Sequence, residues 1–200
     1  MARQKEFDRE VVLAKAMETF WQYGYEGTSI QDLLNSMGIN RGSLYDTFGD
    51  KRSLFLEAIA HYEATIVQQI LKTLAAPNAS KQAIIDYFNQ VVDRIISDKQ
   101  RRGCLLTNTA VELCAHDPDT AQRVTDDLKR VEGAFYMALS RAKTLGELSL
   151  DADIQAIASF LTFSLQGLRV MSRVNPSRET LQAVVRVILS VLESKSQINT

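Results

Sequence analysis

The sequence predicts an all-α protein, on three observations. Apolar residues recur with the 3.6-residue period of a helix along the whole chain, and no strand-like alternation appears. The 200 residues include only 3 prolines and 9 glycines, which leaves long stretches without a helix breaker. With 46% apolar and 24% charged residues, the composition is that of a globular chain and excludes disordered and fibrous classes. A chain of this length can bury a sizeable core without disulfides or metals.

The first two predicted helices are bounded by glycines and by a capping residue. The first helix carries apolar residues on one face and ends at Gly24. Thr28 or Ser29 opens the second helix, because each is followed three residues later by a side chain that can complete a capping box. Apolar residues at positions 30, 33, 34 and 37 form one face of this helix, which ends at Gly38.

The third and fourth helices follow at once, and longer helices occupy the rest of the chain. Asn40 can cap a short helix that ends at Gly49, and Asp50 can cap the next. The segment AAPNAS, residues 75–80, interrupts the periodicity and is the best candidate for a boundary. Beyond it the period predicts helices over residues 81–96, 105–115, 118–143, 152–171 and 177–194.

Two helices joined by the turn Met37-Gly38-Ile39-Asn40 have the layout of a helix-turn-helix. Gly38 is expected to leave the first helix in a left-handed conformation, and Ile39 is expected to pack in the small core. To enter a DNA major groove, the second helix must present small or polar side chains on one face. The residues that meet this requirement are Arg41, Gly42, Ser43 and Thr47. A plain helical hairpin is the alternative interpretation.

The charge of the chain limits how it could bind DNA. The formal net charge is −1, and residues 1–52 hold seven basic and eight acidic side chains. Binding to nucleic acid through bulk positive charge alone is therefore not expected. We expect modest nonspecific affinity and a need to pair two such domains.

The run FWQYGYEGTSIQDLLNSMGINRGSLYDTFGDKRSLFLEAI resembles the DNA-binding domain of the tetracycline-repressor (TetR) family of bacterial transcriptional regulators. The resemblance covers about residues 7–60 and is specific at the glycines around the turn. It implies a two-domain, all-helical homodimer. Residues 1–65 would form the helix-turn-helix domain, and residues 66–200 would bind an effector and dimerise. Such a protein usually represses transcription until a small molecule releases it from double-stranded operator DNA.

The resemblance also assigns roles to single residues. Arg41, Gly42 and Ser43 would face the bases, with Gln31 able to join them. The residues expected to contact backbone phosphates are Thr28, Tyr45, Thr47 and Lys51. Arg41 is the candidate for direct readout, because its guanidinium fits the O6 and N7 atoms of guanine. Asp46 departs from the family pattern, and we expect it to turn toward Arg52 or solvent.

The last two predicted helices are apolar around most of their girth, which requires burial that a single chain of this size hardly provides. A four-helix dimer interface explains both helices, and an ordinary monomer core is the alternative. The residues predicted to dimerise are Leu161, Leu165, Leu168, Leu181, Val185, Ile188 and Leu192.

An effector cavity is expected among the helices of the second domain. The candidate lining residues are Tyr87, Phe88, Cys104, Phe135, Met137, Phe160 and Phe163, with plain core packing as the alternative for each. No charged residue stands on an apolar face, which favours a neutral or apolar effector. Cys104 follows Arg101-Arg102-Gly103 at a helix start, where a thiolate is stabilised. This suggests a thiol that senses oxidants or electrophiles, against the alternative of a small packed residue.

Other functions lack their motifs. No nucleophile elbow, phosphate loop, dinucleotide fingerprint or zinc-protease motif occurs, so we expect neither an enzyme nor a cofactor. Two cysteines, Cys104 and Cys114, provide neither a disulfide framework nor a metal site. The chain shows no signal segment and no membrane-spanning run, which favours a cytoplasmic protein without a membrane partner. The competing class is a helical carrier or scaffold that binds apolar ligands without DNA.

Overall fold

The computed structural model describes residues 7–174 and 176–193, which contain helices and no strand. Contacts between Cα atoms divide the chain into two units, each of which is described by itself. The first unit takes in the chain up to Val67 together with Cys104–Val124, and the second comprises Gln68–Gly103 and the chain from Thr125 onward. The all-α prediction is confirmed for the described residues.

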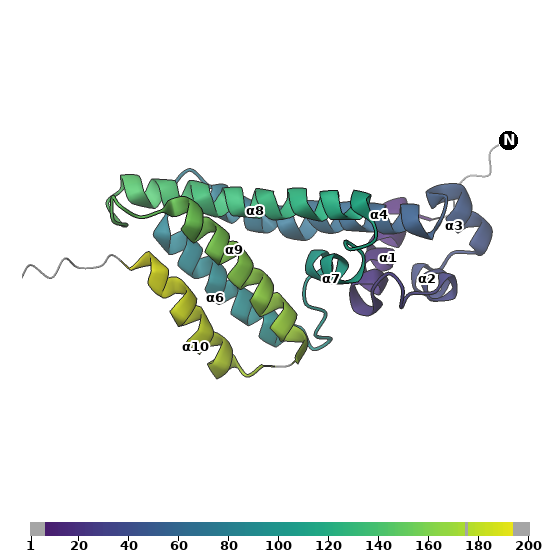
Figure 1. Ribbon diagram of the computed structural model, residues 1–200. Helices are drawn as coiled ribbons and strands as arrows, with labels where there is room; N and C mark the ends of the chain where they lie inside the picture. The colour runs from purple at the N-terminus through teal and green to yellow at the C-terminus, as the bar shows by residue number, and fades with distance from the viewer. Residues whose placement is uncertain (1–6, 175, 194–200) are drawn as a thin grey trace, which may run out of the picture. The chain divides into compact units, whose positions relative to one another are not determined.

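The first unit is built around α1. Its elements are α1 (Arg9–Tyr23), α2 (Ile30–Met37), α3 (Arg41–Phe48), α4 (Lys51–Tyr62), a π-helical turn (Glu63–Val67), α7 (Leu105–Glu112) and the start of α8 (Pro118–Thr144) (Figure 1). Helix α1 packs against α2, α4 and α7, and α4 also packs against α3 and α7. The ring of Phe20 lies 5.0 Å from that of Phe55, edge to face, in the core between α1 and α4.

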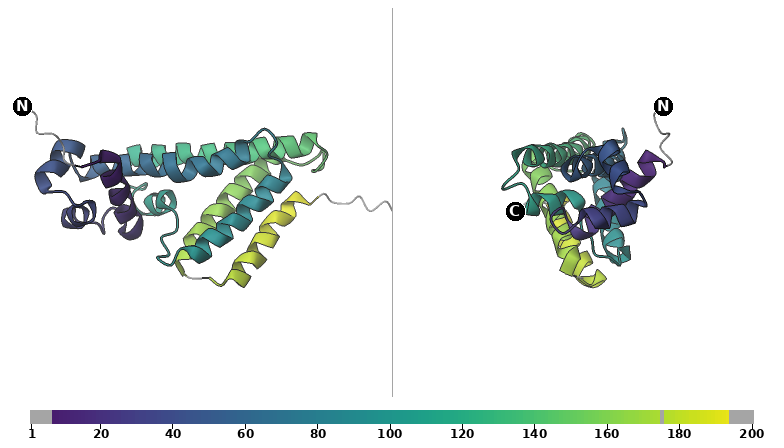
Figure 2. Two further views of the ribbon diagram at one scale, coloured as in Figure 1. Left: turned by 180° about the vertical axis from the view of Figure 1, so that it is seen from behind. Right: turned by 90° about the vertical axis from the view of Figure 1, so that its right-hand side faces the viewer.

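The second unit consists of longer helices. Its elements are α5 (Gln68–Ala75), α6 (Lys81–Ser97), the rest of α8, α9 (Ile154–Met171), the 3-10 turn η2 (Ser172–Val174), α10 (Arg178–Leu189) and the 3-10 turn η3 (Ser190–Leu192). Helices α6, α9 and α10 lie side by side, as the front view in Figure 1 and the view from behind in Figure 2 both show. A cluster of three buried aromatic rings joins α6 to α8: Tyr87, Phe88 and Phe135, with centroids 5.8–5.9 Å apart.

Three features of the fold differ from the sequence prediction. Cys104–Val124 belongs to the first unit, whereas the sequence placed everything after residue 65 in one domain. The segment at residues 75–80 lies inside the second unit, where the Arg141 guanidinium donates to the carbonyls of Leu74 and Ala79 at 2.6 and 2.5 Å. Helix α7 ends at Glu112, three residues early, and the predicted end of the last helix, Ser194, lies outside the described residues.

The cap of α3 supplies a test of local stability. Asn40 Oδ1 accepts a hydrogen bond from the backbone N–H of Ser43 at 2.8 Å, which satisfies one free donor of the helix start. We expect Asn40→Ala to lower the free energy of unfolding by about 1 kcal/mol, because alanine cannot accept this bond. Urea unfolding followed by circular dichroism measures the change. Asn89→Ala in the middle of α6 is the control and should be neutral or slightly stabilising, since alanine is the better helix former there.

Candidate nucleic-acid interface

Local hydrogen bonds fix the turn between α2 and α3. Ser29 and Asp32 form a complete capping box at the start of α2, as the sequence predicted for one of two possible caps. Gly38 has φ 72° and ψ 31°, and its N–H donates to the Leu34 carbonyl at 2.9 Å. This left-handed conformation is the one that a glycine adopts at least cost, so the chain can turn sharply into α3.

Helix α3 has one buried and one exposed face. Leu44 and Phe48 are buried against the core of the first unit, as expected. Of the predicted contact residues, Arg41, Gly42 and Tyr45 are exposed and Ser43 is half-buried. The small polar surface at the start of α3 is thus free to approach a flat or grooved partner.

Gln31 stands on the neighbouring helix and is also exposed. Its Nε2 donates to Asn35 Oδ1 at 2.9 Å, so the amide is held along the exposed side of α2. The interaction is between exposed side chains and is easily exchanged for a bond to a ligand.

Two predicted phosphate contacts have no exposed hydroxyl in the structure. Thr28 is fully buried, and its hydroxyl donates to the Gly24 carbonyl at 2.6 Å, which closes the α1–α2 loop. The Thr47 hydroxyl is covered by neighbouring atoms and makes no hydrogen bond among the described residues. The local sequence showed these residue types but not the inward direction of their side chains.

Lys51 and Arg52 open α4 and have different surroundings. The Lys51 ammonium lies 4.3 Å from the ring centroid of Tyr25, a cation–π contact that holds the amine near the α3–α4 turn. The pKa of the Tyr25 phenol is raised by burial and, to a lesser extent, by the charges of Glu26 and Asp50. The raised pKa keeps this phenol protonated to a higher pH than an exposed tyrosine.

Arg52 forms ion pairs with aspartates at the start of α8 and in the loop before it. Its Nη2 lies 2.9 Å from both carboxylate oxygens of Asp117 and 3.3 Å from Asp119. This geometry is a two-point pair between a guanidinium and a carboxylate. Arg52 is thus paired with Asp117 and Asp119, and Asp46 is exposed, so the structure supports the second of the two directions expected for Asp46, toward solvent.

A carboxylate far along the chain organises the α1–α2 loop. Glu112, the last residue of α7, accepts the backbone N–H of Tyr25 at 3.0 Å and that of Glu26 at 2.8 Å. Gly24 has a φ of 79°, a conformation that favours glycine, and a Cβ placed there would lie 2.8 Å from a Glu112 oxygen, which would have to shift. Sequence reasoning missed Glu112, because nothing in its own neighbourhood indicates a partner 86 residues away.

The Asp117 carboxylate makes the first unit sensitive to acid. The backbone N–H of Thr120 and the Arg52 guanidinium hold the pKa of Asp117 below its usual range. A depressed pKa in the folded state stabilises the fold above the unfolded pKa, about 3.9, and this stabilisation disappears as the pH falls through the folded value. We expect Asp117→Asn to melt at a lower temperature than the parent at pH 7, with a difference that shrinks below about pH 4.

Thermal unfolding followed by circular dichroism between pH 7 and pH 3 measures this difference. Asp119→Asn is the matched control, because this carboxylate meets the same arginine at 3.3 Å but is 84% exposed. A difference for Asp117→Asn that stays constant with pH would contradict the prediction.

The predicted effector residues do not share one cavity. Tyr87, Phe88 and Phe135 form the closed aromatic cluster of the second unit, whereas Met137, Phe160 and Phe163 are exposed. Cys104 is buried in the first unit, where the Tyr62 hydroxyl donates to its sulfur at 3.6 Å. The helical period placed these residues on inward and outward faces alike, because α8 and α9 are apolar on more than one side.

The seven predicted dimerisation residues are all buried within the single chain. They form the contacts of α9 and α10 with the rest of the second unit and leave no side chain for a partner. A different apolar set on the same two helices and on η2 and η3 is exposed: Phe160, Phe163, Val170, Met171, Val174, Val184, Val187 and Val191. The excess of apolar residues noted in the sequence thus divides into an inner and an outer face.

Two further observations concern the described residues. They contain no group of three or more histidine, cysteine, aspartate or glutamate side chains that could hold a metal ion. None of their helices is both long enough and apolar enough to cross a membrane.

A short helix that follows a glycine turn, packs one apolar face on a small helical core and exposes a polar face has the layout of a helix-turn-helix protein. Residues 12–58 match the family model described as bacterial regulatory proteins, tetR family, and residues 80–188 match the tetracyclin repressor-like C-terminal domain. The chain belongs to the TetR family, which confirms the resemblance drawn from the sequence.

Individual relatives extend over nearly the whole chain. The HTH-type transcriptional regulator YezE of Bacillus subtilis is 43% identical over 96% of this chain and 100% of its own. The HTH-type transcriptional repressor ComR of Escherichia coli is 28% identical over 94% of this chain and 90% of its own. Among solved structures, a cysteine mutant of the TetR family regulator CifR complexed with 26-bp operator DNA has a TM-score of 0.84 and 31% identity, covering 94% of this chain and 98% of its own.

Proposed function

We propose that the protein is a homodimeric transcriptional repressor that binds operator DNA through α3 and leaves it when an effector binds. The observation that carries the proposal is the exposed polar start of α3, with Arg41 and Gly42 presented by a capped, glycine-turned helix. The similarity to CifR, which was solved on operator DNA, supports the same use of this surface. The protein then acts by binding rather than by catalysis, in the cytoplasm where its DNA target lies.

The contacts on DNA divide into two kinds. Arg41 reads a guanine through its two-pronged guanidinium, while Ser43 and Gln31 stand beside it. Lys51 and Tyr45 meet backbone phosphates, which position the protein without reading sequence. Thr28 closes the α1–α2 loop, and neither Thr28 nor Thr47 contacts DNA directly, since their hydroxyls are covered.

Dimerisation uses the exposed apolar face of α9 and α10. Phe163 is 73% and Val187 71% exposed in the single chain, values that are unusual for such large apolar side chains. One short recognition helix reads only a few base pairs, and a dimer places two of them about one turn of DNA apart, roughly 34 Å. The dimer therefore recognises a longer DNA sequence than one protomer and binds its operator more specifically.

The effector is a small molecule, and the alternative of a thiol-reactive effector has a direct test. Burial and the charge of Asp117 raise the pKa of Cys114, so this cysteine is a poor nucleophile. Cys104 is the candidate instead, at the start of α7 and in contact with the Tyr62 hydroxyl. If a quinone releases DNA from the Cys114→Ser variant but not from Cys104→Ser, Cys104 is the sensor. Equal release from both variants excludes it.

Fluorescence anisotropy against DNA from upstream of the protein's own gene tests the proposed function. A scrambled duplex is the control, and the salt is stepped from about 50 to 200 mM, where phosphate-driven binding falls steeply. Binding that distinguishes the duplexes at the upper salt supports an autoregulating repressor. Absence of binding to any genomic fragment would favour a helical carrier without DNA.

A further inference from the structure

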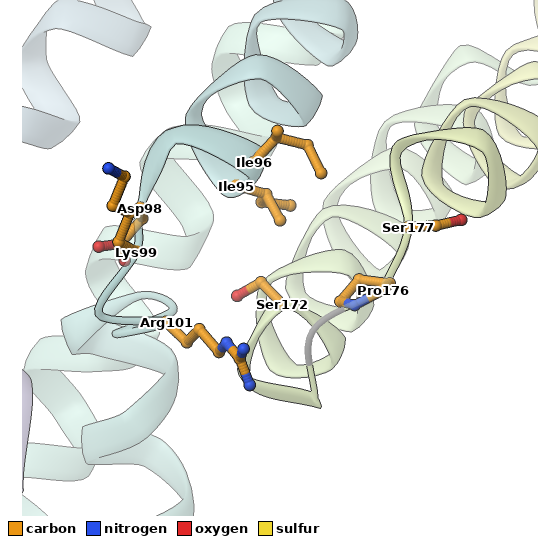
Figure 3. A pocket seen from close by; sticks show the side chains of 8 residues that line it. All are labelled: Ile95, Ile96, Asp98, Lys99, Arg101, Ser172, Pro176 and Ser177. Carbon is orange, nitrogen blue, oxygen red and sulfur yellow. The ribbon is translucent and has the colours of Figure 1, made fainter.

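The end of α6, the loop after it, η2 and the start of α10 enclose a groove of about 490 Å³ in the second unit. Its walls combine apolar and polar groups. They consist of Ile95, Ile96, Asp98, Lys99, Arg101, Ser172, Pro176 and Ser177. Figure 3 shows Ile95 and Ile96 projecting from α6 into the opening, and Arg101 reaching from the loop toward the side formed by Ser172.

The charge around the groove is opposite to that of the whole chain. Residues 93–102 and 169–178 contain seven arginines and lysines but only two acidic residues, in a protein whose net charge is −1. Both acids are already paired with other arginines: Arg178 lies 2.7 Å from Asp93, and Arg102 lies 3.3 Å from Asp98. Neither of the two acids is therefore paired with Arg101.

The Asp98 carboxylate accepts further hydrogen bonds within its own loop. Besides the Arg102 guanidinium, its carboxylate accepts the backbone N–H groups of Gln100 and Arg102 at 3.3 and 2.8 Å. These bonds fold the loop back on itself and use the negative charge inside it. The acidic residue in the groove wall is thus unavailable to neutralise Arg101.

Arg101 combines an unusual backbone with an unpaired side chain. Its φ of 54° is the one positive value among the described residues other than glycine, and this conformation is strained for a side chain of its size. Its guanidinium makes no hydrogen bond or ion pair within the described part of the chain, and the residue is exposed. Glycine would adopt this backbone conformation at lower cost. The presence of arginine therefore points to a role for its guanidinium group.

We propose that this groove binds a small organic anion that has an apolar body. The carboxylate, sulfonate or phosphate group pairs with Arg101, whose fork matches such oxygens, and the body lies against Ile95, Ile96 and Pro176. This ligand class differs from the neutral or apolar effector that the sequence favoured. The sequence argument considered only the faces of helices, which carry no charge among their apolar residues, whereas the charge of Arg101 comes from a loop. Gly103 separates Arg101 and Arg102 from Cys104, so an occupant held by Arg101 acts on the segment that leads directly into α7.

The binding claim stands on the groove alone, and its regulatory consequence rests on the proposed function. The probe is 1-anilinonaphthalene-8-sulfonate, whose fluorescence reports binding, and its neutral twin is N-phenyl-1-naphthylamine, which lacks the sulfonate. We expect Arg101→Gly to lower the affinity for the sulfonate at least 10-fold and to leave the affinity for the neutral twin unchanged. The same variant should melt at the parental temperature or above it, because glycine relieves the positive φ.

Lys72→Gln, which removes an exposed charge from α5, is the matched control and should bind both probes as the parent does. Equal sulfonate binding by the parent and Arg101→Gly, or equal binding of both probes by the parent, would overturn the proposal. These titrations use the free full-length protein, so they are independent of DNA binding.

The regulatory consequence is measured separately on the operator complex. Sulfonate that lowers operator affinity of the parent but not of Arg101→Gly supports effector action through this groove. If the sulfonate binds the groove but does not change operator affinity, the regulatory role is wrong and the proposal of a binding site still holds. Failure to bind any operator would contradict the proposed function and leave the groove result unaffected.

Discussion

Arg41→Ala is expected to weaken strongly the distinction between operator and scrambled DNA. A guanidinium that binds guanine through two hydrogen bonds contributes about 1–3 kcal/mol of discrimination. A dimer loses this contribution at both half-sites, so operator affinity should fall between about 30-fold and 10⁴-fold, limited below by nonspecific binding. Binding to scrambled DNA should fall much less, because phosphate contacts supply most of that affinity. Fluorescence anisotropy with both duplexes at about 150 mM salt measures the two effects.

The control for Arg41→Ala removes the same charge elsewhere. Lys129 is exposed on α8, so Lys129→Ala changes the net charge equally without touching α3. It should bind both duplexes nearly as the parent does. An Arg41→Ala variant that still prefers the operator by the parental factor would exclude direct readout by this residue.

Phe163→Glu is expected to convert the dimer into a monomer. The ring is 73% exposed on the single chain and would be covered by the partner's α9 and α10, so a buried carboxylate without a counter-ion opposes association. The monomer keeps one recognition helix and should lose specific operator binding at concentrations where the parent saturates. Sedimentation velocity and light scattering measure the mass, and circular dichroism checks that the helices remain.

Leu150→Glu is the control for the dimer prediction. Leu150 is 79% exposed in the loop between α8 and α9, and it does not belong to the outer face of α9 and α10. This variant should remain dimeric. If the Phe163→Glu protein keeps the mass of a dimer, the prediction that the interface includes this face of α9 is wrong.

The predictable parts of the protein are those controlled by neighbours in sequence. Ser29, Gly38 and Asn40 act within one helical turn, so capping rules place α2 and α3 to within a residue. The exposure of Arg41 and Tyr45 follows from the same short-range pattern, because the buried Leu44 and Phe48 fix the orientation of α3.

The parts that the sequence did not predict depend on partners from distant segments. Helices α9 and α10 are apolar on most of their girth, and a helical period alone does not say which side faces the chain's own core. Leu161 and Leu165 turned out to face inward, while Phe160 and Phe163 on the same helix face outward. The groove at Arg101 was equally hidden, since it depends on a loop conformation and on where η2 and α10 meet α6.

The hydrogen bonds of Glu112 and the ion pair of Asp117 have a consequence for how the chain folds. They join residues 65 to 87 positions apart, so the unit that carries the helix-turn-helix is discontinuous in sequence. During synthesis the first 67 residues leave the ribosome without α7, and their contacts with it wait until about 45 more residues have followed. A fragment that ends at Val67 would keep the recognition helix yet leave two backbone amides of the α1–α2 loop and the Arg52 guanidinium without their acceptors. Excising the DNA-reading part of this protein as an N-terminal peptide therefore removes the helix that locks its loop in place.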